Sequence, residues 1–541
     1  MNEAWHSGIG CNVGTGVGRA AMTSDPAINP YDAVAYPGHS FAQTHPARLG
    51  TIAHFHGMRP APPAAMRVLE LGCGRGGNLI PMAAQYPESR FLGIDLSGDS
   101  IRKANEAVTE LALTNIVFEQ ADILALTPEI GIFDYIIVHG VYSWVPDPVR
   151  ERIIALFGTL LAPQGVAYVS YNALPGCRFR DLARDVMLFE TRDIADPRER
   201  VRVARAALKA YAEASDPDSY HGAILRQREK QIEDTPDSVL YHDDLNPIAR
   251  PFALHEVLAA GERHGLQFLA EASFPNPYGA AKGPAQRMLA EIPADPPLAR
   301  EQALDLLIGR AFRETLLCRG DIRLRRGIGA GSLEPYCLAA DVRPVRESEE
   351  ERKPGVERFA FQEGVKLSVD LPACKAALGI LGEAWPASIA YPDLMRRSLD
   401  AAAAEAAAGL DREREAARLD EALIAIFKTG LLDVRLVAPP LAASLGERPV
   451  ASPVVRWQAS TSAEVTDLRH RTVMLDGVLV RKFVCLLDGS RDQAMLLDEM
   501  NSFLDEARAA GPAASGLPDR VTEAEVAMHL QDVVRLGLLH G

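Results

Sequence analysis

The chain has 541 residues, of which 48% are hydrophobic and 24% charged, and its formal net charge is −15. This length exceeds what a single hydrophobic core organises, so several domains are expected. The acidic balance disfavours nucleic acid as a partner, because contact with phosphates needs clustered Lys and Arg, whereas a basic protein substrate would suit it.

No apolar run reaches the roughly 18 residues that a membrane span needs, so no membrane insertion is expected. The glycine-rich first residues carry no signal-peptide pattern, and the cytoplasm is the expected compartment. Residues 1–25 are expected to form a disordered tail. The seven cysteines include no C-x-x-C pair, which argues against a disulfide framework and a zinc cluster.

The first informative segment precedes an amphipathic helix expected from Ala47 to about Phe55. It combines aromatic, hydroxyl and imidazole side chains, and two interpretations are open: rings that cover a bound cation through their π faces, or a helix packed on a sheet edge. The histidines nearby have no acidic or Cys partner at ligand spacing, so no metal site is predicted. The segment contains Tyr31, Tyr36, His39, Phe41, Thr44, His45 and Pro46, and the other two histidines, His54 and His56, lie at the end of the helix.

A glycine-rich turn then follows a short expected strand, Arg67–Leu71, and Asn78 opens a helix. Glycines let a backbone approach a ligand closely, and a helix N-terminus offers unpaired N–H groups, so the turn indicates a nucleotide-cofactor loop. Read from Gly72, the spacing is the G-x-G-x-x-G of dinucleotide enzymes. Read from Glu70, it is the E-x-G-x-G-x-G of S-adenosylmethionine (SAM) methyltransferases, and the loop alone does not decide.

Two further expected strands end in acids suited to a nucleoside. Phe91–Asp95 ends in an acid that would bind ribose hydroxyls. The strand from Ile116 ends at Asp122, which would take an adenine amino group while the N–H of Ile123 reaches the ring, although a helix cap is the alternative. Phe133–Val138 is a buried strand that opens into His139, and another helix and an apolar strand, Val166–Tyr171, follow.

Four β-α units predict an α/β fold with a doubly wound parallel sheet, whose ligands lie at the carboxyl ends of the strands. The acid after the third strand favours SAM over a dinucleotide. The side chains predicted to deliver the acceptor are His139, Tyr142 and Trp144. The predicted cofactor-binding residues are Tyr31, Tyr36, Thr44, His45, Glu70, Gly72, Cys73, Gly74, Gly76, Asn78, Asp95, Leu96, Asp122, Ile123 and His139.

Together these motifs, with Gly93-Ile-Asp-Leu-Ser and the run from Phe133 to Pro146, resemble the bacterial class I methyltransferases that carry a methyltransferase regulatory domain. The rickettsial outer-membrane-protein lysine methyltransferases belong to that family. The resemblance covers about residues 30–345, and Arg75 departs from it where many relatives have an acid. It implies a Rossmann-like sheet, S-adenosyl-L-methionine without a metal, and lysine side chains of an envelope protein, for example an outer-membrane or surface protein, as acceptor.

The expected domain organisation has five parts after the tail. A SAM-binding domain spans 26–180, and a regulatory or helical insertion with the end of the sheet spans 181–345. A charged linker at 346–358 precedes two winged-helix-like modules, 359–445 and 446–541. Each is predicted to contain three helices, the last of which ends in Gly-Leu-Leu. Leu266–Glu271 and Leu333–Asp341 are candidates for the sixth and seventh strands.

A lysine acceptor must lose a proton before it attacks, since its ordinary pKa is about 10.4, and an apolar aromatic channel would lower that value. His139 could act as a general base or only orient a backbone group. The pair His242-Asp243 could be catalytic, although a structural turn is favoured. Two other functions stay open: a small-molecule methyltransferase, and a SAM-binding regulator without turnover. A homodimer is an option in each case.

Overall fold

The computed structural model describes residues 38–275, 283–293, 295–345, 355–361, 364–405, 410–442, 444–509 and 517–541. The expected tail, Tyr31, Tyr36 and most of the expected linker lie outside these ranges. Strand β10 (Glu357–Phe361) begins within the last residues of that linker. Among the described helices, none has the length and apolar character needed to cross a lipid bilayer.

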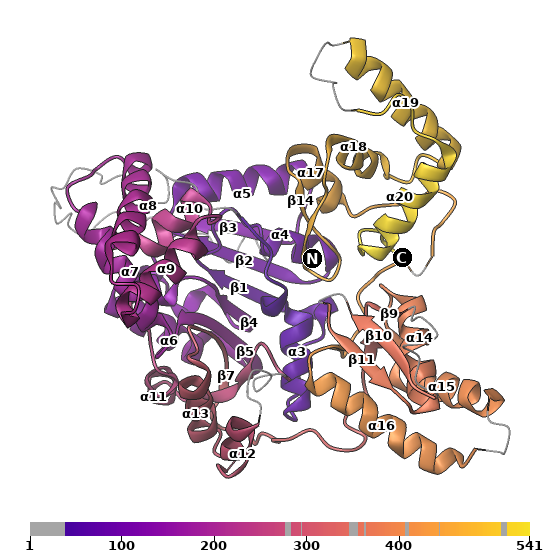
Figure 1. Ribbon diagram of the computed structural model, residues 1–541, viewed down its shortest axis with the longest axis horizontal. Helices are drawn as coiled ribbons and strands as arrows, with labels where there is room; N and C mark the ends of the chain where they lie inside the picture. Colours follow the sequence, from indigo (N-terminus) through magenta and orange to yellow (C-terminus); the bar gives the residue numbers. More distant parts are fainter. Residues whose placement is uncertain are drawn as a thin grey trace.

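The centre of the molecule is a seven-stranded sheet in the order β3-β2-β1-β4-β5-β7-β6 (Figure 1). Only β7 runs antiparallel to its neighbours, β5 and β6. Most strands are continuous apolar runs, as expected for a sheet covered on both faces. The strands are β1 (Arg67–Leu71), β2 (Arg90–Asp95), β3 (Ile116–Gln120), β4 (Phe133–Val138), β5 (Leu161–Asn172), β6 (Leu266–Glu271) and β7 (Phe312–Arg319).

Two hydrophobic cores lie on the two faces of this sheet. One joins Ile52, Ile80 and Ile101 to β1 and β2, so it is covered by α3 (Pro46–Phe55), α4 (Leu79–Gln85) and α5 (Gly98–Glu110). The other joins Phe157 and Val257 to β4 and β5 under α6 (Asp147–Leu160) and α11 (Leu254–Arg263). The strand order reverses between β1 and β4, and this is the place where open α/β sheets bind their ligands.

The seventh strand of the sheet is Phe312–Arg319, so the assignment of Leu333–Asp341 to it is wrong. Residues Cys337–Ala339 do form a strand, β8, but it pairs with β12 and β13 in a separate small sheet. The polar start of β7 is buried because Arg313, 1% exposed, forms ion pairs with Glu271, Glu301 and Asp305.

A helical insertion separates β5 from β6 and packs around its own core (Figure 1). His242 and Asp243 lie in a short π-helical turn at the end of the insertion, where Arg184 donates to the Asp243 carbonyl and Arg228 pairs with Asp244. These contacts favour the structural interpretation of that pair. The helices are α7 (Cys177–Glu190), α8 (Pro197–Ala214), α9 (Tyr220–Ile232) and α10 (Asp237–Val239), and α12 (Pro284–Ala290) and α13 (Leu298–Ile308) follow β6.

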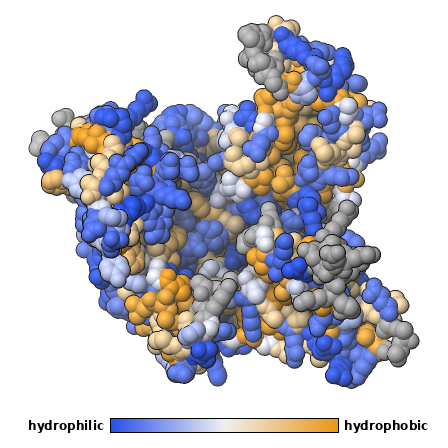
Figure 2. All heavy atoms as spheres, in the orientation of Figure 1, coloured by the Kyte–Doolittle hydropathy of each residue, from blue (hydrophilic) through white to orange (hydrophobic). Residues whose placement is uncertain are grey.

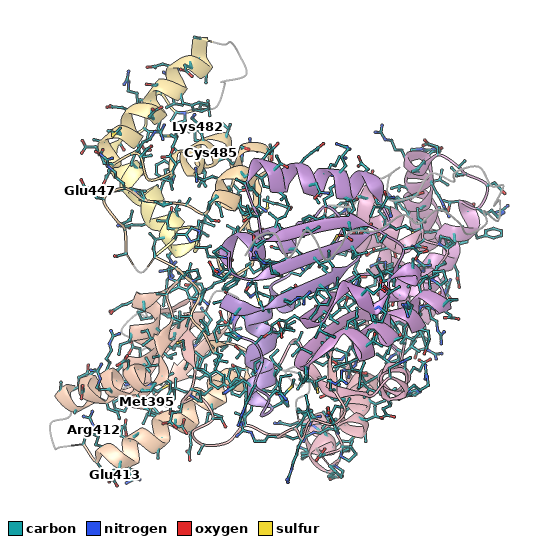
Figure 3. The ribbon with its side chains drawn as sticks, turned by 180° about the vertical axis from the view of Figure 1, so that it is seen from behind. Met395, Arg412, Glu413, Glu447, Lys482 and Cys485 are labelled. Atoms are coloured by element: carbon teal, nitrogen blue, oxygen red, sulfur yellow. The ribbon has the colours of Figure 1, made fainter. Side chains whose placement is uncertain are left out.

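Two further bodies, which we call the middle module (337–435) and the C-terminal module (447–541), lie beside α3 and α4 (Figures 1 and 3). In each, the three expected helices are present, and the last of them ends before a glycine in the left-handed conformation, Gly430 or Gly537. The middle module contains β8, β9 (Val342–Pro344), β10, β11 (Lys366–Val369), α14 (Pro372–Ala384), β12 (Ile389–Ala390), α15 (Tyr391–Glu405), α16 (Arg412–Lys428) and β13 (Asp433–Arg435). The C-terminal module contains α17 (Pro453–Thr461), β14 (Glu464–Thr466), β15 (Thr472–Met474), α18 (Val478–Leu486), α19 (Gln493–Ala509) and α20 (Glu523–Arg535).

Candidate active site

The glycine loop after β1 closes against the sheet and opens toward the strand edge. A Cβ atom at Gly72 would lie 2.3 Å from Val141 Cγ2, and one at Gly76 would lie 2.4 Å from Phe118 Cζ. At Gly74, whose φ is +53°, no heavy atom lies within 4 Å of that position. The loop therefore leaves a gap at Gly74 that only a glycine keeps open, and a ligand can approach the backbone there.

Asp95 links this loop to the end of β2. Its Oδ2 accepts a hydrogen bond from the Gly74 N–H at 2.8 Å, and its Oδ1 accepts one from the Ser97 N–H at 2.8 Å. Leu96, the next residue, is 62% exposed at the same edge. A carboxylate beside an exposed apolar side chain matches the needs of a ribose that carries an aromatic base.

Asp122 lies at the end of β3, as predicted, and caps a short 3-10 helix. Its Oδ1 accepts from the Leu124 N–H at 2.9 Å, and Leu124 itself is 47% exposed. The capping interpretation is therefore correct for one carboxylate oxygen. The cap also holds Ile123 at the strand edge where the adenine ring is expected.

Asn78 is the most connected side chain of the cofactor loop. Its Oδ1 accepts from the Phe41 N–H at 3.1 Å, and its Nδ2 donates to Thr44 Oγ1 at 3.0 Å and to Glu70 Oε1 at 2.8 Å. Thr44 and Asn78 are both buried, at 0% and 3% exposure. Asn78 makes no side-chain cap on α4, so its amide serves this buried polar network instead.

Glu70 provides a test of whether the site fits SAM. Its Oε2 is buried and has no hydrogen-bond partner among the described residues. Burial raises the pKa of this carboxyl from 4.5 to about 8, although the Asn78 amide opposes the rise. Without a cation nearby this carboxyl keeps its proton, whereas the amino group of SAM would stabilise the carboxylate and occupy its unused oxygen, so the residues present fit the group.

His45 and Cys73 have structural partners. The Nδ1 atom of His45 accepts from the Ala47 N–H at 3.2 Å and caps α3, and burial holds the pKa of the imidazole well below its ordinary value. The backbone N–H of Cys73 donates to the Ile94 carbonyl at 3.1 Å. The Cys73 thiol is buried, and burial raises the pKa of the thiol. Both residues shape the loop on which the predicted cofactor site rests.

His139 follows β4 and lies in an aromatic group. Its ring is 3.9 Å from the Phe41 ring, centroid to centroid, and Phe312 approaches it edge-on at 6.3 Å. The Tyr168 hydroxyl donates to Glu314 at 3.1 Å, so His139 Nδ1 donates to that hydroxyl at 2.9 Å. Burial lowers the pKa of the imidazole to about 4, so it is neutral and a weak base near pH 7.

Tyr142 and Trp144 belong to other groups of side chains. Tyr142 is 4% exposed and lies in the core under α6. The centre of its ring is 5.0 Å from that of Phe252 and 6.2 Å from that of Tyr171. Trp144 is half-buried and stacks under the Arg180 guanidinium of α7 at 5.7 Å. Of the three residues predicted to deliver the acceptor, His139 has the aromatic surroundings expected of a channel.

Sequence reasoning missed three side chains that contact this site. Tyr168 lies on β5, in a segment predicted to be a buried strand. Glu314 lies on β7, in a segment assigned to the regulatory domain, so neither polar group was expected at the site. The third, His470, comes from the C-terminal module, and its Nε2 lies 2.8 Å from Asn78 Oδ1. Only its proximity in space reveals its connection to the loop, because 392 positions separate the two residues.

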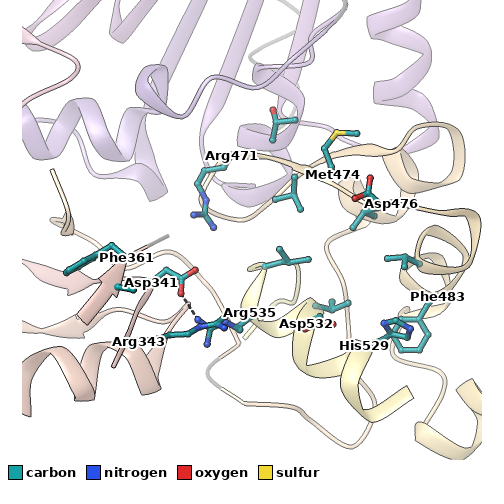
Figure 4. A pocket seen from close by; sticks show the side chains of 17 residues that line it. Asp341, Arg343, Phe361, Arg471, Met474, Asp476, Phe483, His529, Asp532 and Arg535 are labelled. Atoms are coloured by element: carbon teal, nitrogen blue, oxygen red, sulfur yellow. Dashed lines mark hydrogen bonds and ion pairs between the residues drawn. The ribbon is translucent and has the colours of Figure 1, made fainter. Parts of the chain in front are cut away.

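A cavity of about 910 Å³ lies elsewhere, between the middle and C-terminal modules (Figure 4). Its lining mixes charges, and Arg535 reaches across it to form an ion pair with Asp341. The cavity includes neither the glycine loop nor a strand end of the large sheet, so we assign it no role in the chemistry.

The sheet order, the glycine loop, Asp95 after β2 and the buried Glu70 define a class I, SAM-dependent methyltransferase. Three family models match the chain: a methyltransferase domain at residues 63–199, a methyltransferase regulatory domain at 236–319, and the C-terminal winged helix domain of PKMT at 447–538. The last match confirms the winged-helix assignment for the C-terminal module.

Two uncharacterised proteins of Rickettsia prowazekii are similar in sequence. One is 32% identical over 240 residues, which cover 44% of this chain and 96% of that protein. The other is 34% identical over 320 residues, which cover 59% of this chain and 58% of its own length, so the match spans little more than half of that relative. The chain belongs to this family of methyltransferases with a regulatory domain.

The structure of PKMT2 from Rickettsia typhi has the same fold over nearly the whole chain. The TM-score is 0.82 at 24% identity, with 94% of this chain and 100% of that chain covered. A second structure of PKMT2, in complex with AdoHcy, gives a TM-score of 0.81.

Proposed function

We propose that this protein transfers the methyl group of SAM to lysine side chains of a protein acceptor. The proposal takes its acceptor class from the family, whose PKMT winged-helix model matches the C-terminal module, and from the resemblance to the rickettsial enzymes. By the same resemblance, the acceptor we favour is an outer-membrane or surface protein.

The observation that carries the proposal is an exposed apolar rim formed by the end of α13 and by the start of β7, where Phe312 contacts His139. Phe312, whose ring contacts His139, is 44% exposed, and Leu306 and Leu307 of α13 are 66% and 38% exposed. Figure 2 shows hydrophobic surface over this end of α13 and the start of β7. A metabolite enzyme would enclose its substrate, whereas an open rim can receive a side chain presented by a large partner.

The residues of the site would act mainly by positioning and by removing water. SAM supplies an electrophilic methyl group, so the acceptor amine must be unprotonated and aligned with it. The aromatic group of Phe41, His139 and Phe312 would lower the pKa of an entering lysine by desolvation. His139, neutral and hydrogen-bonded through Nδ1, would orient the amine more than it would take up its proton.

The domain division expected from the sequence is part of the proposal. It is supported by separate hydrophobic cores in the helical insertion, the middle module and the C-terminal module. We further propose a homodimer formed through α7, because Phe179, Leu182 and Phe189 lie on one face of that helix and are 56%, 36% and 59% exposed. A cytoplasmic site of action agrees with the six free thiols among the described residues.

The test uses methyl-labelled SAM, the purified protein and an envelope extract of the source cell, separated on a denaturing gel. We expect label in a discrete protein band that is lost in Asp95→Ala and retained in the control Glu106→Ala, which breaks an exposed ion pair with Arg102 on α5. Acid hydrolysis should release methyl-lysine from the band. Label found only in a small-molecule fraction would refute the protein acceptor, and binding without label would favour the regulator.

A further inference from the structure

The hairpin of the C-terminal module inserts its loop into the methyltransferase domain. The loop Asp467–Arg471 joins β14 to β15, and its fourth residue, His470, is 1% exposed. Its Nε2 lies 2.8 Å from Asn78 Oδ1, and its ring is 5.0 Å from that of His45. A side chain of the last module thus closes the polar network that begins at Glu70.

The direction of this hydrogen bond follows from the other partners of Asn78. The backbone N–H of Phe41 can only donate, so the atom it contacts at 3.1 Å is the amide oxygen. His470 must then donate from Nε2. Burial lowers the pKa of the imidazole to about 3, so it donates as the neutral tautomer with its proton on Nε2.

The loop is built to hold His470 in this position. His470 has φ +66°, a conformation that side-chain-bearing residues rarely adopt and that surrounding contacts must maintain. Asp467 accepts from the N–H groups of Arg469 and Arg471 at 2.9 and 2.7 Å. From α4, Gln85 Nε2 donates to the Leu468 carbonyl at 3.0 Å, so both sides of the interface fix the loop.

The middle module also holds the loop. Arg469 forms an ion pair with Asp433 of β13, donates to the Pro386 carbonyl, and its guanidinium lies 4.8 Å from the centre of the Trp385 ring. The methyltransferase domain, the middle module and the C-terminal module therefore meet at the five residues of this loop. The loop lies next to Asn78, whose amide contacts Glu70.

We infer that the hairpin loop of the C-terminal module is part of the cofactor site, and that His470 is a positioning residue for it. His470 fixes the Asn78 amide, and the amide directs the Glu70 carboxylate toward the cationic end of SAM. The inference rests on the proposed function only in taking SAM as the ligand. Binding energy is shared between the two sites, so cofactor binding and docking of the C-terminal module stabilise each other.

The experiment measures binding of S-adenosylhomocysteine by calorimetry, which needs no acceptor. His470→Ala should weaken binding about 3- to 10-fold, the scale of one lost hydrogen bond, because Asn78 Oδ1 keeps the Phe41 N–H as a donor. His470→Gln keeps a side-chain N–H donor and should recover part of the loss. Glu110→Gln is the matched control, because Glu110 accepts from the Trp457 indole at 2.6 Å across the same interface but away from the network, and it should bind within about 2-fold of wild type.

A second measurement needs no variant and applies even if His470→Ala fails to fold. In the wild-type protein, S-adenosylhomocysteine should slow amide hydrogen exchange in residues 467–472 as well as in the glycine loop. Equal binding by folded His470→Ala, or protection confined to the glycine loop, would overturn the inference and leave the proposed function intact. If the wild-type protein bound no S-adenosylhomocysteine, the proposed function itself would fail.

Discussion

The hydroxyl of Tyr168 lies 2.9 Å from Nδ1 of His139 and joins that ring to the β7 side of the sheet. Because Tyr168 also donates to Glu314, it determines which imidazole nitrogen of His139 carries the proton. The orientation of the ring beside the acceptor position therefore depends on a residue from a neighbouring strand.

Tyr168→Phe should lower kcat about 10-fold, the scale of one lost positioning hydrogen bond. S-adenosylhomocysteine affinity should stay within about 2-fold, because Tyr168 belongs to the acceptor side. The control is Tyr171→Phe on the same strand, which removes a hydrogen bond to Thr315 in the opposite core and should reduce stability without this effect on kcat. Equal kcat values for Tyr168→Phe and wild type would show that the contact has no part in positioning.

The pH dependence of methylation should follow the acceptor lysine and not His139. The pKa of His139 is lowered to about 4, so the ring is neutral throughout pH 6–9 and its titration contributes no step there. We expect kcat/KM to rise by about tenfold per pH unit across this range while the lysine ammonium loses its proton. A plateau with a midpoint between pH 6 and 7, lost in His139→Asn, would instead identify His139 as a general base.

Two glycines of the cofactor loop should respond differently to the same substitution. Gly74→Ala places a methyl group in open space at the strand edge, so it should reduce S-adenosylhomocysteine affinity more than 10-fold at a stability cost of about 1 kcal/mol for the left-handed φ. Gly76→Ala meets the Phe118 ring and should destabilise the fold more strongly. Calorimetry and thermal melts of both variants test this contrast, which the reverse order of effects would contradict.

Glu70→Gln should change how stability depends on pH. The folded-state pKa of Glu70 is raised to about 8, so the folded chain keeps a proton that the unfolded chain loses above its ordinary pKa of 4.5. The contribution of Glu70 to wild-type stability therefore falls as pH rises from about 4.5 to about 8. Without ligand, Glu70→Gln should melt at the wild-type temperature near pH 4.5 and increasingly above it toward pH 8.5. A constant difference across this range would show that Glu70 ionises normally.

The exposed face of α7 predicts the behaviour of the protein in solution. If this face forms the dimer, Phe179→Ser combined with Phe189→Ser should halve the mass measured by light scattering at micromolar concentration. Tyr220→Ser, at a position 92% exposed on α9, is the control and should leave the mass unchanged. A wild-type protein that is monomeric under the same conditions would remove the proposed dimer.

The first six strands of the large sheet were predictable because each is an apolar run followed by a turn signal. The seventh was not, since Phe312-Arg-Glu-Thr resembles a solvent-facing segment. Arg313 is buried there only because Glu271, Glu301 and Asp305 surround it, and these partners lie on other elements. Local sequence carries no sign of such compensation.

The candidate site divides in the same way. Side chains attached to strand ends, such as Asp95 and Asp122, could be placed from spacing alone. The network around Asn78 could not, because its amide reads as the start of a helix and its partner His470 is contributed by another module. Contacts that depend on the docking of two modules leave no periodic pattern in either segment.

The order of strands has a consequence for how this protein can be divided. The segment matched as a regulatory domain, 236–319, contains β6 and β7, while the matched methyltransferase segment, 63–199, ends after β5. In the whole protein, residues Ala167 to Asn172 of β5 pair with β7. A fragment made at that boundary would leave β5 as an unpaired apolar edge strand that can pair with another chain. The two matched segments are therefore one folding unit, and neither half is expected to be soluble when expressed without the other.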